Sequence, residues 1–158
     1  MPMLLWRYRE WGNLFLVVNT IINLIGNLKG ENECWLKGLL LEELTSLNRS
    51  WNFAPPIIAK SGCTALNYNK AEKAYYLIRK EMGTMKFQIP ASKESPLENP
   101  AFVIKNFDGN IRNIEVEINN GRAEFKRGIE LDTEGKKNLV IWIPYSSASK
   151  TSFKIFSK

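Results

Sequence analysis

Serine and lysine side chains are the main candidates for chemistry in this chain, because its 158 residues include no histidine. Without an imidazole the chain offers no Ser–His or Cys–His nucleophile pair and no ordinary histidine metal site. Ser147 and Lys150 match the S-x-x-K spacing of one class of serine hydrolase. That motif works on a shared helix face, whereas this pair lies in a serine-rich stretch. The sequence around it favours an ordinary loop.

Two pairs of carboxylates offer a second kind of hydrolytic chemistry. Glycoside cleavage uses two acids that face each other across the scissile bond. Glu94 with Glu98, and Glu130 with Asp132, have suitable side chains, but each pair lies among residues typical of turns. We therefore expect these four side chains to be solvated surface groups, and we predict no catalytic residue.

Metal and cofactor sites find little support in the sequence. Cys34, in a stretch with a helical pattern, and Cys63, in a glycine-containing loop, are the only cysteines. Two cysteines without histidine cannot complete a structural zinc site. They could form a disulfide in an exported protein or stay as buried thiols in a reducing compartment. The chain has only two aspartates, which argues against a calcium site built from several carboxylates. We predict no cofactor and no bound metal.

Aromatic side chains provide the one candidate for a binding site. A sugar ring packs its apolar face on an indole or a phenol, so an exposed aromatic on a sheet can hold a carbohydrate. Trp142 and Tyr145 are the predicted ligand-binding residues. For Trp142 the alternative is a core position, since it lies within a strongly apolar run. Tyr145 follows Pro144 at the end of that run and is the better candidate for exposure.

A β-hairpin is the clearest structural element that the sequence predicts. Residues 114–118 alternate strictly between apolar and charged side chains, which is the pattern of a half-buried strand. The Asn-Gly dipeptide that follows is favoured in two-residue type I′ turns. With Asn120 and Gly121 as the turn residues, the predicted register pairs Ile118 with Ala123 and Val116 with Phe125. In the same register Glu115 meets Lys126.

Short runs rich in β-branched and aromatic residues suggest further strands at residues 74–78, 85–89, 101–104, 139–143 and 152–156. The run 139–143 is apolar throughout, as in a central strand packed on both faces. About seven short strands separated by turn residues are typical of a sandwich or a barrel. We predict a mainly β fold, an antiparallel two-sheet β-sandwich at residues 57–158, preceded by a helix-containing N-terminal segment, residues 1–56, that packs on it.

The N-terminal segment has a different pattern. Apolar residues at steps of three and four predict a helix from Asn32 or Glu33 to about Ser50, ended by Pro55 and Pro56. Residues 14–28 are ambiguous. Their β-branched cluster favours a strand, whereas asparagines at four-residue spacing favour a helix, and both alternatives remain open.

Residues 14–28 are also the only stretch that raises the question of a membrane. Fifteen residues fall short of the roughly 20 that a spanning helix needs, and three asparagines would be costly in lipid. Arg7 and Arg9 precede the stretch as in a signal peptide, but no small-residue cleavage site follows. We predict core packing and no membrane span.

Net charge gives no indication of nucleic-acid binding. The formal charge of +6 is spread evenly, because residues 1–100 carry 12 basic and 9 acidic groups and residues 101–158 carry 10 and 7. Nucleic-acid binders usually concentrate their positive charge on one face or segment. We predict no nucleic-acid partner.

Three segments together resemble a known class of module. Residues 95–107, 116–121 and 139–143 read SPLENPAFVIKNF, VEINNG and LVIWI. Over residues 57–158 the chain is similar to the C-terminal β-sandwich modules of secreted bacterial polysaccharide-processing proteins, such as heparinase-like lyases and related enzymes. The resemblance implies a module that packs on a catalytic domain and performs no chemistry itself.

Two functions follow as hypotheses. The favoured one is a non-catalytic accessory or binding module associated with a carbohydrate-active or cell-surface protein, whose partner is a polysaccharide or a neighbouring catalytic domain. The sequence leaves the location open, and the resemblance slightly favours one outside the cytoplasm. The alternative is a small histidine-free hydrolase that uses a Ser–Lys or carboxylate pair.

Overall fold

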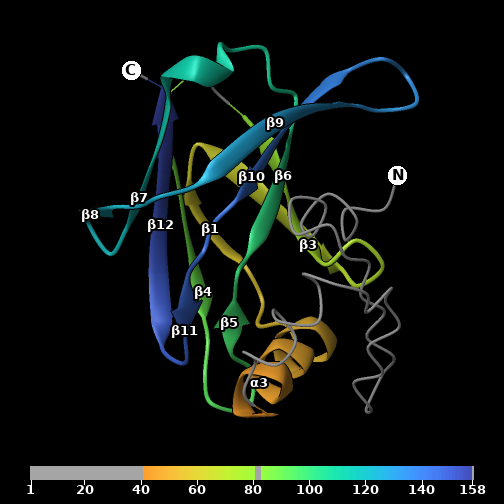
Figure 1. The fold of residues 1–158 in the computed structure, drawn as a ribbon. Coiled ribbons are helices and arrows are strands. Elements are labelled where there is room, and N and C mark those ends of the chain that lie inside the picture. The colour runs from red at the N-terminus through yellow and green to blue at the C-terminus, as the bar shows by residue number, and fades with distance from the viewer. Residues whose placement is uncertain (1–40, 81–82, 158) are drawn as a thin grey trace, which may run out of the picture.

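The computed structural model describes residues 41–80 and 83–157 (Figure 1). Residues 14–28, the first part of the predicted helix and Cys34 lie outside this range. The described part is mainly β, as predicted. Its elements in chain order are α3 (Leu41–Asn52), β1 (Ile58–Ser61), β2 (Cys63–Asn69), β3 (Ala74–Arg79), β4 (Met85–Pro90), β5 (Leu97–Glu98), β6 (Ala101–Lys105), the short 3-10 helix η2 (Ile111–Asn113), β7 (Ile114–Ile118), β8 (Gly121–Arg122), β9 (Lys126–Leu131), β10 (Lys137–Trp142), β11 (Ser146–Ser147) and β12 (Lys150–Ser157).

The strands form two five-stranded sheets and one small sheet. The first sheet has the order β1-β4-β12-β7-β8, the second has the order β2-β3-β6-β10-β9, and β11 pairs with β5. Among the strand pairs of the described residues, β3 and β6 are parallel, so the prediction of a purely antiparallel fold is wrong at this pair. The reason is the path between them: the chain leaves β3, passes through β4 in the first sheet, and returns to lie beside β3 in the same direction.

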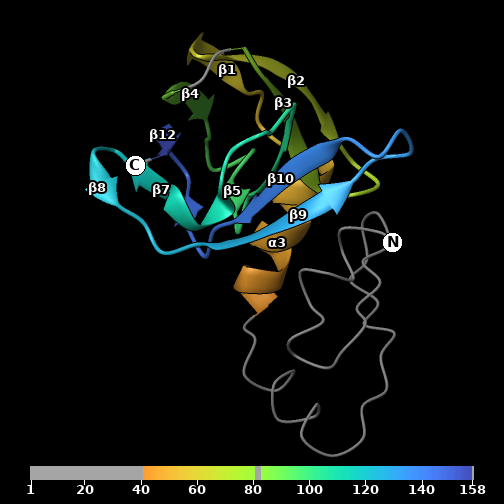
Figure 2. The same cartoon turned by 90° about the horizontal axis from the view of Figure 1, so that it is seen from above.

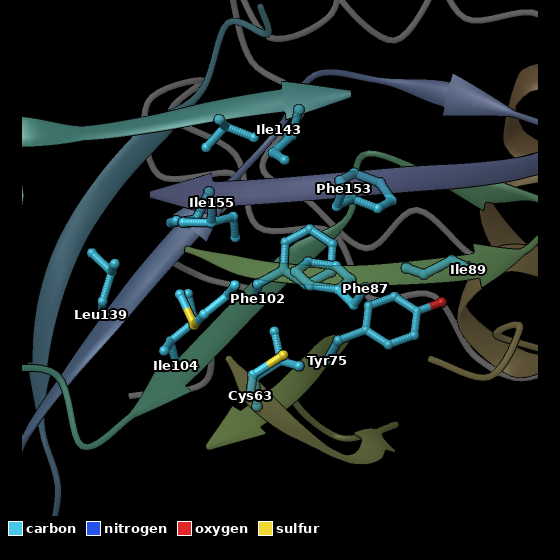
Figure 3. Close-up of a cluster of buried hydrophobic side chains, with 14 of the residues drawn as sticks. Cys63, Tyr75, Phe87, Ile89, Phe102, Ile104, Leu139, Ile143, Phe153 and Ile155 are labelled. Carbon is cyan, nitrogen blue, oxygen red and sulfur yellow. The ribbon is translucent and has the colours of Figure 1, made fainter. Parts of the chain in front are cut away.

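One hydrophobic core receives side chains from both five-stranded sheets. Phe87 and Phe153 come from the first sheet and stack with centroids 5.2 Å apart. Phe102 comes from the second sheet, and its ring lies 5.1 Å from Phe87 and 5.2 Å from Phe153. Figure 3 shows these three rings together, with aliphatic side chains such as Ile104 and Ile155 beside them. The alternation of inward and outward residues along each strand therefore determines which side chains enter the core.

The strand β10 is buried on both faces, as predicted. Leu139 and Ile141 belong to the core shared by the two sheets. Val140 and Trp142 point to the opposite face, where they pack with buried residues of β3 and β6 in a second apolar cluster. β10 lies between β6 and β9 within its sheet, which explains why its sequence is apolar throughout.

The hairpin is present, but its predicted register is wrong by two residues. Asn119 and Asn120 occupy the turn with positive φ values of 49° and 68°, and Ile118 pairs with Gly121 instead of Ala123. Asparagine tolerates this backbone region better than most residues, so either Asn-Asn or Asn-Gly can form the turn. The Asn119 backbone N–H donates to the Ser152 carbonyl, and the Ser152 N–H donates to Asn119 Oδ1, each at 2.9 Å. These two contacts favour the observed register.

The second strand of the hairpin is short because the chain changes sheets after it. β8 contains only Gly121 and Arg122, and Lys126 already begins β9 in the second sheet.

Cys63, predicted in a glycine-containing loop, instead begins β2 as a buried free thiol. Burial raises the pKa of this thiol.

Helix α3 ends at Asn52, as the two prolines that follow predict. The Phe53 N–H donates to the Arg49 carbonyl at 2.8 Å and completes the last turn. Trp51 is only 2% exposed, and Ser46 Oγ donates to Glu98 Oε1 at 2.5 Å, which ties the helix to β5 at one end of the strands (Figure 1). Within residues 41–80 and 83–157, no helix has the length and apolar character needed to cross a membrane.

Candidate binding site at the hairpin turn

Two open hollows lie on either side of the Asn119-Asn120 turn. We call the first the Tyr145 hollow; it has a volume of about 340 Å³ and is lined by Ile118, Asn119, Gly121, Arg122, Ala123, Glu124, Ile143, Pro144 and Tyr145. We call the second the lysine hollow; it has a volume of about 300 Å³ and is lined by Lys60, Lys86, Phe87, Gln88, Glu117, Asn120, Ser152, Phe153 and Lys154. Asn119 lines the first and Asn120 lines the second, so the turn separates them.

The backbone and ring of Tyr145 are held in place at the Tyr145 hollow. Its N–H donates to the Ile143 carbonyl at 2.9 Å, and its carbonyl accepts from the Asn99 N–H at 2.8 Å. Its ring meets that of Phe153 nearly at right angles, with centroids 6.4 Å apart. The side chain is half-buried, so part of it contacts the core and part faces the hollow. An aromatic ring fixed in this way can bind an apolar surface at little entropic cost.

Polar residues line the same hollow as Tyr145. The Arg122 side chain is 77% exposed, and its Nη2 lies 3.3 Å from Glu115 Oε1. Asn119 and Glu124 are also exposed at this hollow. Guanidinium, amide and carboxylate groups together supply both donors and acceptors for hydroxyl groups. The Tyr145 hollow therefore combines one aromatic surface with polar lining residues, as small-molecule and sugar sites do.

The lysine hollow lies on the outer face of the first sheet. Lys86 of β4 stands directly opposite Lys154 of β12, and Lys60 lines the same hollow. Lys154 Nζ lies 3.0 Å from Glu117 Oε2 and 4.4 Å from the centroid of the Phe156 ring. Like charges at opposite positions of neighbouring strands are destabilising. With three ammonium groups and one carboxylate among its lining residues, this hollow favours an anionic ligand group.

Replacing Lys86 with glutamine should stabilise the free protein by about 0.5 kcal/mol, because it removes the repulsion between Lys86 and Lys154. Urea denaturation at low ionic strength measures the change, which should shrink in high salt. Lys150→Gln is the matched control, since Lys150 is an exposed lysine of β12, the strand of Lys154, and stands opposite Pro90 of β4. A loss of stability in Lys86→Gln would show that this lysine contributes a favourable contact instead.

The structure does not bring Trp142 and Tyr145 together in one hollow. Trp142 lines neither the Tyr145 hollow nor the lysine hollow; it is 9% exposed in the second apolar cluster, with Lys126 Nζ 5.5 Å from its ring centroid. This placement agrees with the alternative of a core position. Ligand binding by Trp142 therefore stays a prediction that neither of these two hollows supports.

The candidate hydrolytic residues have contacts typical of turns and surface networks. Ser147 Oγ donates to the Ser149 carbonyl and accepts from the Ser149 N–H, both at 3.1 Å. These bonds form a local serine turn, and Lys150 begins the next strand with an exposed side chain.

The acidic candidates are also held by neighbouring groups. Glu98 accepts hydrogen bonds from Ser46 and Ser146. The Glu94 backbone N–H and the Ser92 hydroxyl hold the pKa of the exposed Glu94 below its usual range. Burial and the nearby Glu72 raise the pKa of Glu130.

Asp132, the partner proposed for Glu130, accepts the N–H groups of Glu134 and Lys136 in a tight turn. Within the described part of the chain, no three acidic or cysteine side chains gather closely enough to hold a metal ion.

The sequence pointed to Tyr145, whose role in binding stays a prediction, and gave no specific indication of the lysine hollow. Lys60, Lys86 and Lys154 come from strands that are distant in sequence and adjacent in the sheet. The only signal available was the outward position of Lys86 and Lys154 in two alternating strands. That signal becomes specific only when the order of the strands is known.

Comparison with protein families, with curated proteins and with solved structures gives no match for this chain. The chemistry of the two hollows is therefore the basis on which a function can be proposed.

Proposed function

We propose that this protein is a two-sheet β-sandwich that works as a non-catalytic accessory module and binds a polysaccharide through the Tyr145 hollow. The sandwich is supported by the common core, in which rings from both five-stranded sheets lie about 5 Å apart. Such a module would act beside a carbohydrate-active or cell-surface protein, with a catalytic domain as its neighbour.

The observation that carries the proposal is the arrangement around Tyr145. A sugar presents C–H groups on one face and hydroxyl groups around its rim. The phenol ring suits the face, and Arg122, Asn119 and Glu124 suit the hydroxyl groups. An open hollow of about 340 Å³ admits a unit within a longer chain, since both ends of the polymer can leave through solvent.

The lysine hollow supports a polymer that carries carboxylate or sulfate groups. It lies across the Asn119-Asn120 turn from Tyr145, so one extended ligand could contact both hollows. Ammonium groups bind such anions through charge-assisted hydrogen bonds, and this contribution weakens in salt. Binding by Tyr145 contributes an apolar contact that persists in salt.

Affinity electrophoresis through gels that contain neutral or acidic polysaccharides tests the proposal. We expect retardation by at least one polymer, with Tyr145→Leu weakening the binding about tenfold, which corresponds to about 1.4 kcal/mol. Leucine preserves the apolar contact with Phe153 and removes the aromatic face. Phe53→Leu is the matched control, because Phe53 is an exposed aromatic residue on the segment after α3.

Thermal denaturation of each variant shows whether the fold is retained. Equal binding by Tyr145→Leu and the wild type, in folded protein, would contradict the Tyr145 site. Retardation by a DNA oligonucleotide that matches or exceeds every polysaccharide would assign the protein to another binding class. Release of reducing ends from any polymer would favour the hydrolase instead.

A further inference from the structure

The strand β9 forms an exposed edge of the second sheet. It pairs with β10 on one side and stands last in the strand order. Figure 2 shows it along the outer border of the strands, with β10 beside it on the inner side. Most of its side chains are exposed, including Ile129 at 40% and Leu131 at 63%. Natural proteins usually protect such edges, because an open edge can pair with a strand of another chain.

The hydrogen-bond pattern identifies the backbone groups on this edge. The Asp132 N–H donates to the Lys136 carbonyl at 3.0 Å, one position beyond the pair of Leu131 and Lys137. Antiparallel strands alternate between hydrogen-bonded and non-hydrogen-bonded pairs. Lys126, Gly128 and Glu130 therefore face β10 with their backbone groups. The N–H and carbonyl groups of Arg127, Ile129 and Leu131 point outward along the edge.

The edge is free of bulges and prolines and is therefore suited to pairing. Its register against β10 is continuous from Lys126 opposite Trp142 to Leu131 opposite Lys137. The strand contains no proline. Bulges and prolines are the features that commonly block pairing at an edge. The exposed Ile129 and Leu131 add apolar surface that pairing would cover.

Charge along β9 is opposite at its two ends. Lys126 and Arg127 lie at the start of the strand, and Glu130 lies near its end. A second copy that runs antiparallel places the basic end of one strand beside the acidic end of the other. The β9 edge is therefore complementary in charge to the same edge of a second copy, provided that the two strands run antiparallel. A parallel arrangement of the two copies would bring like charges together.

We propose that two copies of this protein pair antiparallel through β9, about a two-fold axis at Gly128. In this register Lys126 of each copy stands opposite Glu130 of the other, on the outer face of the sheet. Arg127 and Ile129 form the hydrogen-bonded pairs, which matches the outward direction of their backbone groups. The two second sheets then continue into one sheet across the axis. This inference is independent of the polysaccharide proposal.

Two further features agree with this register. Gly128 has no side chain, so the two strands meet at the axis without a steric conflict. Burial raises the pKa of Glu130, and the nearby carboxylate of Glu72 raises it further. A lysine from the second copy would offset the repulsion between the two carboxylates. Opposite charges at paired positions stabilise antiparallel strands by about 0.2–1 kcal/mol per pair.

Sedimentation velocity over a wide range of protein concentrations tests the proposal. The wild type should shift from monomer to dimer as its concentration rises. Lys126→Glu and Glu130→Lys should each lose the dimer, because each places like charges opposite one another twice. An equal mixture of the two variants should recover it, since the mixed pair restores both opposite-charge contacts. Lys136→Glu is the matched control, because Lys136 lies in the turn beyond the strand.

Ile129→Pro provides a second test that does not depend on charge. It removes an N–H that points away from β10, so circular dichroism should show the fold retained while the dimer is lost. A wild type that stays monomeric at every concentration would overturn the proposal. So would a dimer that persists in both charge variants and in Ile129→Pro, or a mixture of the charge variants that fails to associate while both are folded.

Discussion

Phe102→Ala should lower the free energy of unfolding by about 3–5 kcal/mol, as large-to-small changes of buried aromatic residues do. Phe102 is fully buried, and its ring contacts Tyr75, Phe87 and Phe153, with centroids between 5.1 and 5.7 Å away. Two of these rings belong to the opposite sheet, so the cavity would open where the two sheets meet. Domains of this size have a total stability of about 5–15 kcal/mol, so the loss is a large part of the whole.

Urea denaturation followed by tryptophan fluorescence measures this loss. Phe53→Ala is the matched control, since the same atoms are removed from a side chain that is 65% exposed. Its effect should stay within about 0.5 kcal/mol. Similar losses in the two variants would mean that Phe102 does not carry the contact between the sheets. A low midpoint for Phe102→Ala with an unchanged slope would support the cavity explanation.

Strands with one buried face could be predicted closely from the sequence. Residues 85–89 and 114–118 alternate between apolar and polar side chains, and they correspond to β4 and β7 within one residue. The same alternation identified the end of the chain as β12. In each case one face meets the core and the other meets solvent, so the period of two is preserved in the sequence. Local pattern and tertiary environment agree in these strands.

The first two strands were missed because their pairing is irregular. The register of β1 against β4 shifts between Ala59 and Ser61, and that of β2 against β3 shifts between Ala65 and Tyr68. An extra residue at such a position moves the following side chains to the other face. The alternation in the sequence is thereby interrupted, and residues 58–69 resemble a loop. The buried Cys63 was assigned to that loop for the same reason.

The path from one sheet to the other was also beyond local reasoning. The run after the hairpin turn continues through Phe125 to Lys126 without a turn signal, so it was predicted as one strand paired with β7. In the structure the pairing ends at Arg122, and β9 pairs with β10 instead. The competition between these partners is decided by long-range packing. A single sequence contains little information about that choice.

The candidate site was predictable to the same limited extent. Tyr145 could be identified because it follows a proline at the end of an apolar strand, where a side chain can leave the core. The residues that accompany it, Arg122 and Asn119, come from the hairpin turn, and their proximity depends on the order of β7 and β12 in the sheet. Trp142 lies within the apolar run itself and is buried in the second apolar cluster.

Gly62→Ala should destabilise the protein by about 3 kcal/mol, for two reasons that add. Gly62 has a φ of +71°, a backbone region that costs a residue with a Cβ atom about 1–2 kcal/mol. A Cβ atom there would also lie 2.2 Å from the Thr84 carbonyl oxygen and 3.0 Å from its carbon. These are backbone atoms at the start of β4, so the strand itself would have to move. The Gly62 carbonyl accepts from Lys80 N–H at 3.1 Å, which resists that movement.

Gly135→Ala separates the two contributions. Gly135 has a similar φ of +76°, but a Cβ atom at this position would meet nothing within 4 Å. Its cost should therefore be the backbone term alone, about 1 kcal/mol. Urea denaturation gives the loss in free energy of unfolding for each variant. The difference between the two losses measures the cost of the steric conflict at Gly62. Equal losses would mean that β4 moves freely away from the turn, and the close packing between the end of β1 and the start of β4 would then contribute little to stability. A clear difference would show that glycine is required here because two backbone segments approach each other, in addition to the shape of the turn.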